Sequence, residues 1–225
     1  GVLGMTDILA ATELNPEQIK YLSVIRNSGR TLLRVIDDIL DFAKIEAHKL
    51  SVVNRPFDLH LLINEVDLLF QTKAEEKSLN FSVDVNCNFS LNPIGDPDRI
   101  KQILFNLLGN AFKFTQEGEV QLSVHCVLDP EQHIVELIFT VSDTGVGISA
   151  ENQSRLFQEF MQVGESTQHI QGTGLGLVIT RNLLILMNGA ITLSSEVGKG
   201  SRFCARIPLK YEMVEKDALP ELAPI

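Results

Sequence analysis

The sequence predicts an α+β fold in which a helical hairpin precedes a mixed sheet with helices on one face. Two patterns carry this prediction. Apolar residues recur at three- and four-residue steps over residues 16–47, which is the period of an amphipathic helix. From residue 57 onward, helical patterns alternate with short runs of apolar and polar residues that are typical of strands. The chain has 225 residues, of which 44% are apolar, so it is long enough to bury a sizeable core.

Residues 1–47 are predicted to form a helical hairpin that begins partway through its first helix. Asn15 suits the N-cap of the long helix, Pro16 suits its first position, and Glu17 places a carboxylate at the positive end of the helix dipole. A two-helix hairpin cannot bury both apolar faces, so we favour dimerisation into a four-helix bundle over a hairpin that only packs on the rest of the chain. The apolar positions of the long helix include Ile19, Leu22, Ile25, Leu32, Leu33, Ile36, Ile39, Leu40, Ala43 and Ile45.

The chain after the hairpin is divided into a connector (48–56), a second domain (57–211) and a linker-like tail (212–225) that is charged and then rich in Pro and Ala. A turn at residues 129–131 predicts an antiparallel pairing of the strands on either side. Helices are expected at 57–76, 96–111, 150–160 and 174–187, and strands at 80–85, 119–127, 133–142, 191–195 and 202–208.

Composition excludes several kinds of partner. A net charge of −10 and a pI near 5 argue against nucleic acid and anionic membrane surfaces, which both require a contiguous excess of Lys and Arg. No run approaches the roughly 18 apolar residues of a membrane helix. Cys87, Cys126 and Cys204 are odd in number, lie far apart and form no CxxC pair. We interpret all three as reduced thiols of a cytosolic protein, with a redox-sensing thiol as the alternative.

Two glycine-containing segments predict contact with a nucleotide. Residues 143–148 read DTGVGI, in which Asp143 can accept a hydrogen bond from an exocyclic amine and the glycines allow the backbone to approach a flat ring. The same pattern also occurs in simple turns between strands and helices. Residues 172–177 read GTGLGL and open a helix, whose backbone N–H groups can hold phosphate. No Gly-Lys-Ser/Thr follows, so this segment is not a Walker loop.

A third segment combines polar and apolar residues on one predicted helix. Asn106, Asn110 and Lys113 recur at i, i+4 and i+7, so two carboxamides and one ammonium share a face. A carboxamide oxygen suits magnesium, and the lysine suits phosphate charge. The alternative is an exposed polar stripe. A fourth segment, GKGSRF at residues 198–203, has glycines that are also expected in a simple hairpin turn.

The order of these segments resembles that of sensor histidine kinases. The runs NLLGNAFKFT, DTGVGI, RLFQEF, GTGLGL and GKGSRF are similar to the family's N box, first glycine box, F box, second glycine box and last glycine box. The runs GVLGMTDIL and VIDDILDFAKIEAHKL are similar to its dimerisation and phosphotransfer hairpin, so the resemblance covers nearly the whole chain. It implies a histidine-kinase-type (Bergerat) ATPase fold, an α/β sandwich with a mixed sheet. The motifs and the tail are most similar to those of hybrid kinases, which carry a receiver domain downstream.

The resemblance implies ATP and Mg²⁺ as cofactors and gives each matching residue a role. Asn106 would ligate Mg²⁺, and Asn110 and Lys113 would contact the phosphates, with Asn106 and Lys113 as the catalytic pair. Residues 161–171 would form a lid in which Gln168, His169 and Gln171 depart from the family's usual residues. The remaining assignments are Asp143, Gly145, Gly147 and Ile148 around adenine, Phe114 against the base, Thr173, Gly174, Leu175 and Gly176 around the triphosphate, and Phe157 and Phe160 as lid anchors.

The phospho-accepting histidine of the family has no match in this chain. It would lie about two helical turns before Gly1, and His48, His60, His125, His133 and His169 occupy other positions. The resemblance further implies a homodimer, a receiver-domain partner and a cytoplasmic segment that reaches a membrane only through regions outside this chain. Two alternatives remain open: an ATPase of the gyrase, chaperone or mismatch-repair type, and a non-catalytic nucleotide-binding dimerisation module.

Overall fold

The computed structural model describes residues 1–47, 49–87, 91–158 and 174–213. They divide into two compact units, and we describe each by itself. The first contains residues 1–50 together with residues 174–179 at the start of helix α6, and the second, which we call the sheet unit, contains Ser51–Gln158 and the chain from Thr180 onward. Among the described residues, no helix combines the length and the apolarity needed to cross a membrane.

The hairpin consists of α1 (Val2–Ala10) and α2 (Pro16–Glu46). Asn15 caps α2 as predicted. Its side chain accepts the N–H of Gln18, and the Gln18 side chain accepts the N–H of Asn15, both at 2.9 Å. This reciprocal pair forms a capping box, which satisfies two backbone groups at the start of α2.

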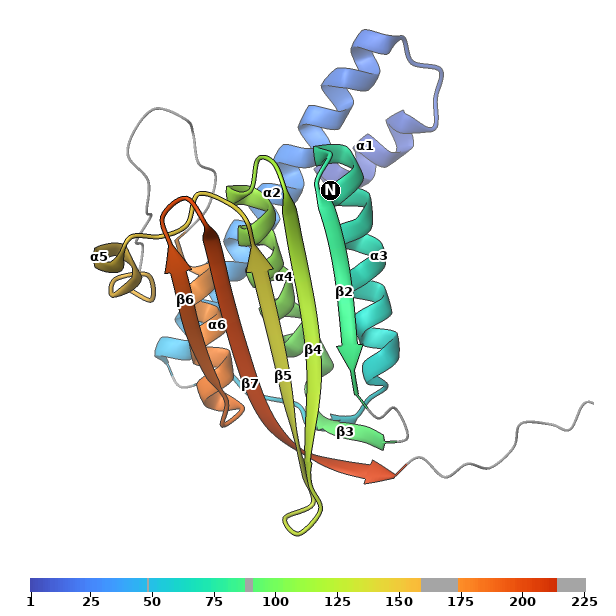
Figure 1. The fold of residues 1–225 in the computed structure, drawn as a ribbon. Helices are drawn as coiled ribbons and strands as arrows, with labels where there is room; N and C mark the ends of the chain where they lie inside the picture. The colour runs from blue at the N-terminus through green and yellow to red at the C-terminus, as the bar shows by residue number, and fades with distance from the viewer. Residues whose placement is uncertain (48, 88–90, 159–173, 214–225) are drawn as a thin grey trace, which may run out of the picture. The chain divides into compact units, whose positions relative to one another are not determined.

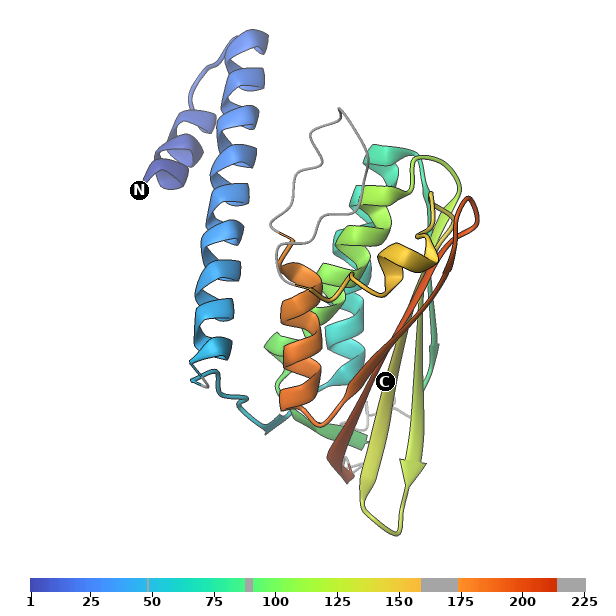
Figure 2. The same ribbon diagram turned by 90° about the vertical axis from the view of Figure 1, so that its left-hand side faces the viewer.

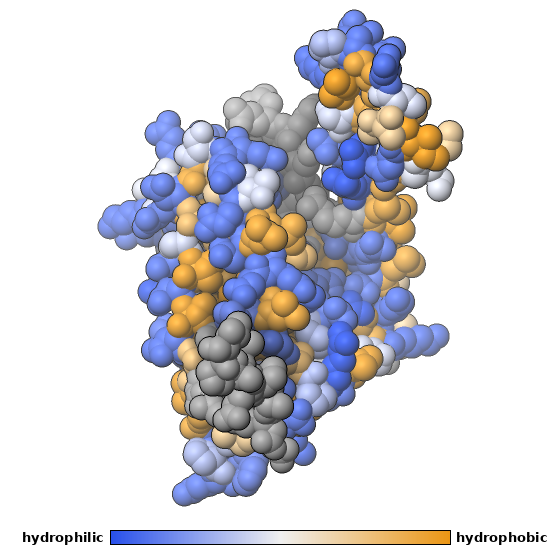
Figure 3. All heavy atoms as spheres, turned by 90° about the vertical axis from the view of Figure 1, so that its right-hand side faces the viewer, coloured by the Kyte–Doolittle hydropathy of each residue, from blue (hydrophilic) through white to orange (hydrophobic). Residues whose placement is uncertain are grey.

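Side-chain contacts join the two helices of the hairpin. Gly29 faces the Leu3 side chain, and an ion pair of 3.0 Å joins Arg26 to Asp7. Many apolar side chains remain exposed, and they are interspersed with polar ones in Figure 3. On α2 these are Ile19, Val24, Ile25, Leu32, Leu33, Ile36, Ile39 and Leu40. A single hairpin therefore leaves most of its apolar seam in water.

The sheet unit is built on one seven-stranded mixed sheet (Figure 1). The strand order is β1-β3-β7-β5-β4-β2, and β6 also pairs with β7. Only the β2–β4 pair is parallel among the strands described, and the predicted β4–β5 hairpin is antiparallel. The strands are β1 (Arg55–Pro56), β2 (Asn80–Asn86), β3 (Leu91–Gly95), β4 (Glu119–Asp129), β5 (Ile134–Asp143), β6 (Ala190–Glu196) and β7 (Gly200–Met213).

Helices cover one face of this sheet, as predicted. Figure 2 shows α3 (Leu59–Lys77), α4 (Pro97–Phe114) and α6 (Gly176–Leu186) on that face. The apolar face of α4 is fully buried, and burial of each large side chain contributes roughly 1.5–3 kcal/mol. The buried residues of α4 include Ile100, Ile103, Leu104, Leu107, Leu108 and Phe112, which pack over the alternating sheet residues Val120, Leu122, Val124, Val135, Leu137 and Phe139.

Several predicted boundaries were wrong. The helix expected at 150–160 is only α5 (Ala150–Gln153), followed by turns, because the Gln153 amide donates to the carbonyls of Ile148 and Ser195 and thus ties the helix end to the sheet. Strands β1 and β3 were not predicted, since each is short and contains proline. Strand β7 reaches beyond the predicted end because its last residues pair with β3.

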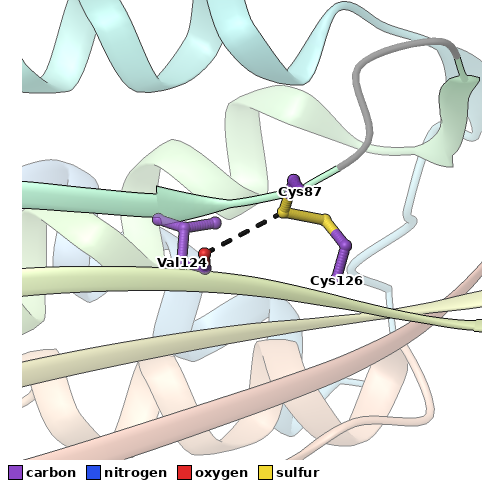
Figure 4. The surroundings of a disulfide bond; sticks show 3 residues. All are labelled: Cys87, Val124 and Cys126. Atoms are coloured by element: carbon purple, nitrogen blue, oxygen red, sulfur yellow. Dashed lines mark hydrogen bonds between the residues drawn. A yellow bond between two sulfur atoms is a disulfide. The ribbon is translucent and has the colours of Figure 1, made fainter.

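The interpretation of all three cysteines as reduced was also wrong. Cys87 and Cys126 form a disulfide between β2 and β4 (Figure 4), whereas the Cys204 thiol is free. Asn86 lies opposite His125 in the parallel ladder, so the next residue of each strand is a cysteine. Their Cα atoms lie 4.9 Å apart, within the range that a disulfide requires. A sequence separation of 39 residues hid this proximity.

Breaking this disulfide is expected to lower the stability of the sheet unit. The crosslink closes a loop of about 40 residues that contains all of α4, which corresponds to about 4 kcal/mol in the chain-entropy model. Denaturant unfolding should therefore give a lower free energy of unfolding with reductant than without, and Cys126→Ser should match the reduced protein in both conditions. Cys204→Ser serves as the control. Equal stability of the wild type with and without reductant would contradict the crosslink.

Candidate nucleotide site

The carboxylate of Asp143 lies half-buried at the end of β5, where the first glycine segment begins. Its Oδ1 accepts the N–H of Gly145 at 2.9 Å, which folds the chain back into a tight turn. Burial raises the pKa of Asp143, and this exceeds the opposing effect of hydrogen bonds from the backbone N–H groups of Gly145 and Ser201. The site therefore holds a partly desolvated carboxylate, which is suited to accept a hydrogen bond from a neutral amine.

The turn after Asp143 packs against the carboxyl end of α4. A Cβ atom on Gly145 would collide with the carbonyl oxygen of Phe114, so a glycine is required at this close approach. The next residue, Val146, donates its N–H to the same oxygen at 3.4 Å. This packing brings Asp143 and Phe114 together, although 28 residues separate them in the sequence.

The last glycine segment supports the same turn. Gly147 has φ +67° and Gly200 has φ +96°, and Cβ atoms there would strike the carbonyl oxygens of Glu196 and Asp143 respectively. The Gly198 N–H also donates to the Val146 carbonyl at 2.8 Å. The turn between β6 and β7 is therefore part of the site's framework as well as a hairpin turn.

A group of polar residues that the sequence analysis missed fixes the far side of this turn. Ser195 Oγ accepts the Ile148 N–H at 2.8 Å and donates to the carbonyl of Gly200 at 2.8 Å. The Ser201 hydroxyl lies 3.1 Å from Ser195 Oγ. Serines on strands carry no sequence signal of this role, because the contacts arise only once β6, β7 and the glycine turn are assembled.

The polar face of α4 is half-buried. Asn106, Asn110, Lys113 and Phe114 all have intermediate exposure, while their neighbours on α4 fill the core. Asn106 Nδ2 donates to Thr180 Oγ1 of α6 at 3.4 Å, and Thr180 is fully buried. The Lys113 ammonium lies 4.9 Å from the centre of the Phe114 ring. The four residues thus lie along α4, and the last of them, Phe114, lies beside the turn that follows Asp143.

The second glycine segment is described from Gly174 onward. Gly174 has φ +72°, Leu175 is buried, and the Ile179 N–H donates to the Leu175 carbonyl at 2.8 Å in the first turn of α6. Thr173, Phe160 and the predicted lid at 161–171 lie outside the described residues. Phe157 is described, and the Arg181 guanidinium lies 6.0 Å from the centre of its ring.

With this fold and this site, the chain belongs to the family of histidine kinase-, DNA gyrase B- and HSP90-like ATPases, whose family model matches residues 95–211. Residues 1–48 match a second family model, the His Kinase A (phospho-acceptor) domain. The two matches together support the resemblance that the motifs indicated.

Two bacterial kinases are among the relatives of this chain. The chain is 38% identical over 223 residues to the autoinducer 2 sensor kinase/phosphatase LuxQ of Vibrio cholerae serotype O1, covering 98% of this chain and 25% of LuxQ. It is 40% identical over 210 residues to the signal transduction histidine-protein kinase BarA of Escherichia coli K12, covering 93% of this chain and 23% of BarA. The chain thus spans about a quarter of the length of these curated relatives.

Solved structures agree with these matches. Full-length ShkA in complex with AMPPNP superimposes with a TM-score of 0.73 at 33% identity, covering 94% of this chain and 43% of ShkA. The histidine kinase ThkA in complex with the response regulator protein TrrA gives a TM-score of 0.59 at 25% identity, covering 92% of this chain and 56% of that one.

Replacing Gly200 by alanine is expected to destabilise the nucleotide-free protein. The positive φ alone costs a non-glycine residue about 1–2 kcal/mol, and the contact with the Asp143 carbonyl adds to this. Gly109→Ala is the matched control, since a Cβ there meets nothing within 4 Å and alanine in a helix interior stabilises by about 0.5–1 kcal/mol. Thermal unfolding of both variants checks the pair. A Gly200→Ala variant as stable as the wild type would refute the proposed close approach.

Proposed function

We propose that this chain is the ATP- and Mg²⁺-binding catalytic region of a sensor histidine kinase, which transfers the γ-phosphate of ATP to a histidine for relay to an aspartate of a receiver domain. The observation that carries this proposal is the packing of the Asp143 turn against the carboxyl end of α4. That packing joins a carboxylate suited to an adenine amine with the helix that bears Asn106, Asn110 and Lys113.

The adenine end of the proposed site consists of Asp143, the glycine turn and Phe114. The ionised Asp143 would accept a hydrogen bond from the exocyclic amine, in surroundings partly withdrawn from water. Gly145, Gly147 and Ile148 would lie at the edge of the ring, and the half-buried Phe114 would lie against its face. The glycines fit this role because their lack of a Cβ already allows close backbone contacts at Gly145 and Gly147.

The phosphate end would use α4 and the start of α6. Asn106 fits a magnesium ligand, because its Nδ2 is bound to Thr180, which fixes the carboxamide, and its Oδ1 is the hard oxygen that Mg²⁺ requires. Bound Mg²⁺ would supply positive charge to offset that of the phosphates. Asn110 and Lys113 would contact phosphate oxygens, and the backbone of Thr173, Gly174, Leu175 and Gly176 would wrap the triphosphate at the N-terminus of α6.

Partners follow from the hairpin. The exposed apolar seam of α2 supports a homodimer, since it is what a four-helix bundle buries. The match to ThkA, whose structure contains a response regulator, supports a receiver domain as the phosphate acceptor downstream.

We further propose that this is the cytoplasmic portion of a hybrid-type, membrane-anchored receptor, and that the phospho-accepting histidine lies upstream of Gly1. The match to the His Kinase A domain favours this function over a gyrase- or chaperone-type ATPase and over a non-catalytic module.

ATP binding by two variants tests this proposal. A hydrogen bond to a charged group contributes roughly 1.5–3 kcal/mol, so Asp143→Asn should weaken ATP binding about ten- to a hundredfold in calorimetry. Asn106→Ala should instead abolish the enhancement of ATP binding by Mg²⁺ and leave adenosine binding largely intact. Asp84→Asn, an exposed change of the same type on β2, is the control. Unchanged ATP affinity in Asp143→Asn would rule out its role in binding adenine.

A further inference from the structure

A buried carboxylate at the start of α4 joins the connector to the helix that carries the proposed phosphate-binding residues. Asp96 is only 6% exposed. Its Oδ1 accepts the N–H groups of Asp98 and Arg99 at 3.2 and 3.1 Å, which caps α4. Its Oδ2 accepts the N–H of Val53 at 2.9 Å. One side chain therefore holds both a helix terminus and the connector.

The connector is attached to the sheet unit from Val53 onward. Arg55 pairs with Gly95 in the β1–β3 ladder, and its guanidinium forms an ion pair with Asp98 at 3.1 Å. The Phe57 N–H donates to the Pro93 carbonyl at 3.0 Å. Of these attachments, the bond between Val53 and Asp96 lies nearest to the hairpin in sequence.

The hairpin holds the other end of the connector. After α2 ends at Glu46, the N–H groups of Lys49 and Leu50 both donate to the Lys44 carbonyl, at 2.8 and 3.2 Å. Only Ser51 and Val52 lie between the hydrogen bonds of Leu50 and of Val53. Three steps between Cα atoms span at most about 11 Å. Ser51 and Val52 therefore form a short linker between the hairpin and the sheet unit.

We propose that Asp96 is a positioning residue that sets the length of this linker and thereby the rate at which the sheet unit delivers phosphate to the acceptor histidine of the kinase. This role rests on the proposed kinase function. Without the bond to Val53, the first residue of the connector held by the sheet unit is Arg55. The linker then grows from three Cα steps to five, or about 18 Å. Once a flexible linker is long enough to span its two sites, effective concentration falls roughly as the −3/2 power of its length, so in this regime the change corresponds to about a twofold decrease.

A single substitution separates the two tasks of Asp96. In Asp96→Asn, the carbonyl oxygen of asparagine can still cap α4, since Asn and Asp are equally good N-caps. The amide NH₂ then replaces Oδ2 and faces the Val53 N–H, where two donors cannot bond. Asp58→Asn is the matched control, because Asp58 caps α3 through the Leu61 N–H and the substitution changes the same charge.

Deuterium exchange on the present chain tests the attachment itself. Asp96→Asn should increase exchange in residues 51–54 and leave residues 97–114 unchanged, whereas Asp58→Asn should leave both segments unchanged. Unchanged exchange of residues 51–54 in Asp96→Asn would overturn the proposal, and so would increased exchange throughout α4, because the residue would then act only as a cap.

Single-turnover phosphotransfer tests the consequence. In the chain extended upstream through its acceptor histidine, Asp96→Asn should slow transfer to its own hairpin about twofold, and insertion of Gly-Ser between Ser51 and Val52 should do the same. Transfer to a separately supplied histidine-bearing hairpin and ATP affinity should not change. Equal losses in both kinds of transfer, or no loss within the extended chain, would overturn the role. No transfer by the wild type would overturn the kinase function, and this role with it, while the exchange result still reports whether the attachment exists.

Discussion

The carboxyl end of α4 is the constraint on which the proposed site depends. A helix ends with carbonyl groups that lack partners within the helix, and a buried end must find them elsewhere. Here the Ala111 carbonyl accepts from Thr115, the Phe112 carbonyl from the Lys77 ammonium at 2.6 Å, and the Phe114 carbonyl from the Val146 N–H. The last of these bonds requires glycine at position 145. Satisfying one helix end thus brings the Asp143 turn to the carboxyl end of the helix that carries the predicted phosphate-binding residues.

The two ends of α4 are attached to different parts of the chain. The amino end is joined through Asp96 to the connector that comes from the hairpin, and the carboxyl end is joined through Phe114 to the turn after Asp143. The 18 residues between them span about 27 Å at 1.5 Å per residue. Because the apolar face of α4 is buried in a close-packed core, we expect the helix to link the proposed nucleotide site to the connector as one rigid element.

Periodicity and glycine motifs predicted the main elements of the fold, but contacts between distant strands were not predictable. The N-cap at Asn15 and the long α2 follow from local chemistry, and the helical pattern identified α4. The Cys87–Cys126 disulfide depends on the parallel register of β2 and β4, which no local pattern encodes. For the proposed site, the residue types and spacing named Asp143 and Asn106, whose roles stay predictions. The supporting contacts of Ser195 and Gln153 were missed because they exist only in the assembled sheet.

Phosphoryl transfer in trans is the most direct measurement of the central claim, that this chain carries the catalytic region of a histidine kinase. The chain would be incubated with labelled ATP, Mg²⁺ and a separate hairpin that bears the family's acceptor histidine. We expect label on the supplied hairpin in an acid-labile, base-stable form, as a phosphohistidine gives, and none retained on the chain itself. Steady release of phosphate without labelled hairpin would indicate an ATPase and would contradict the claim.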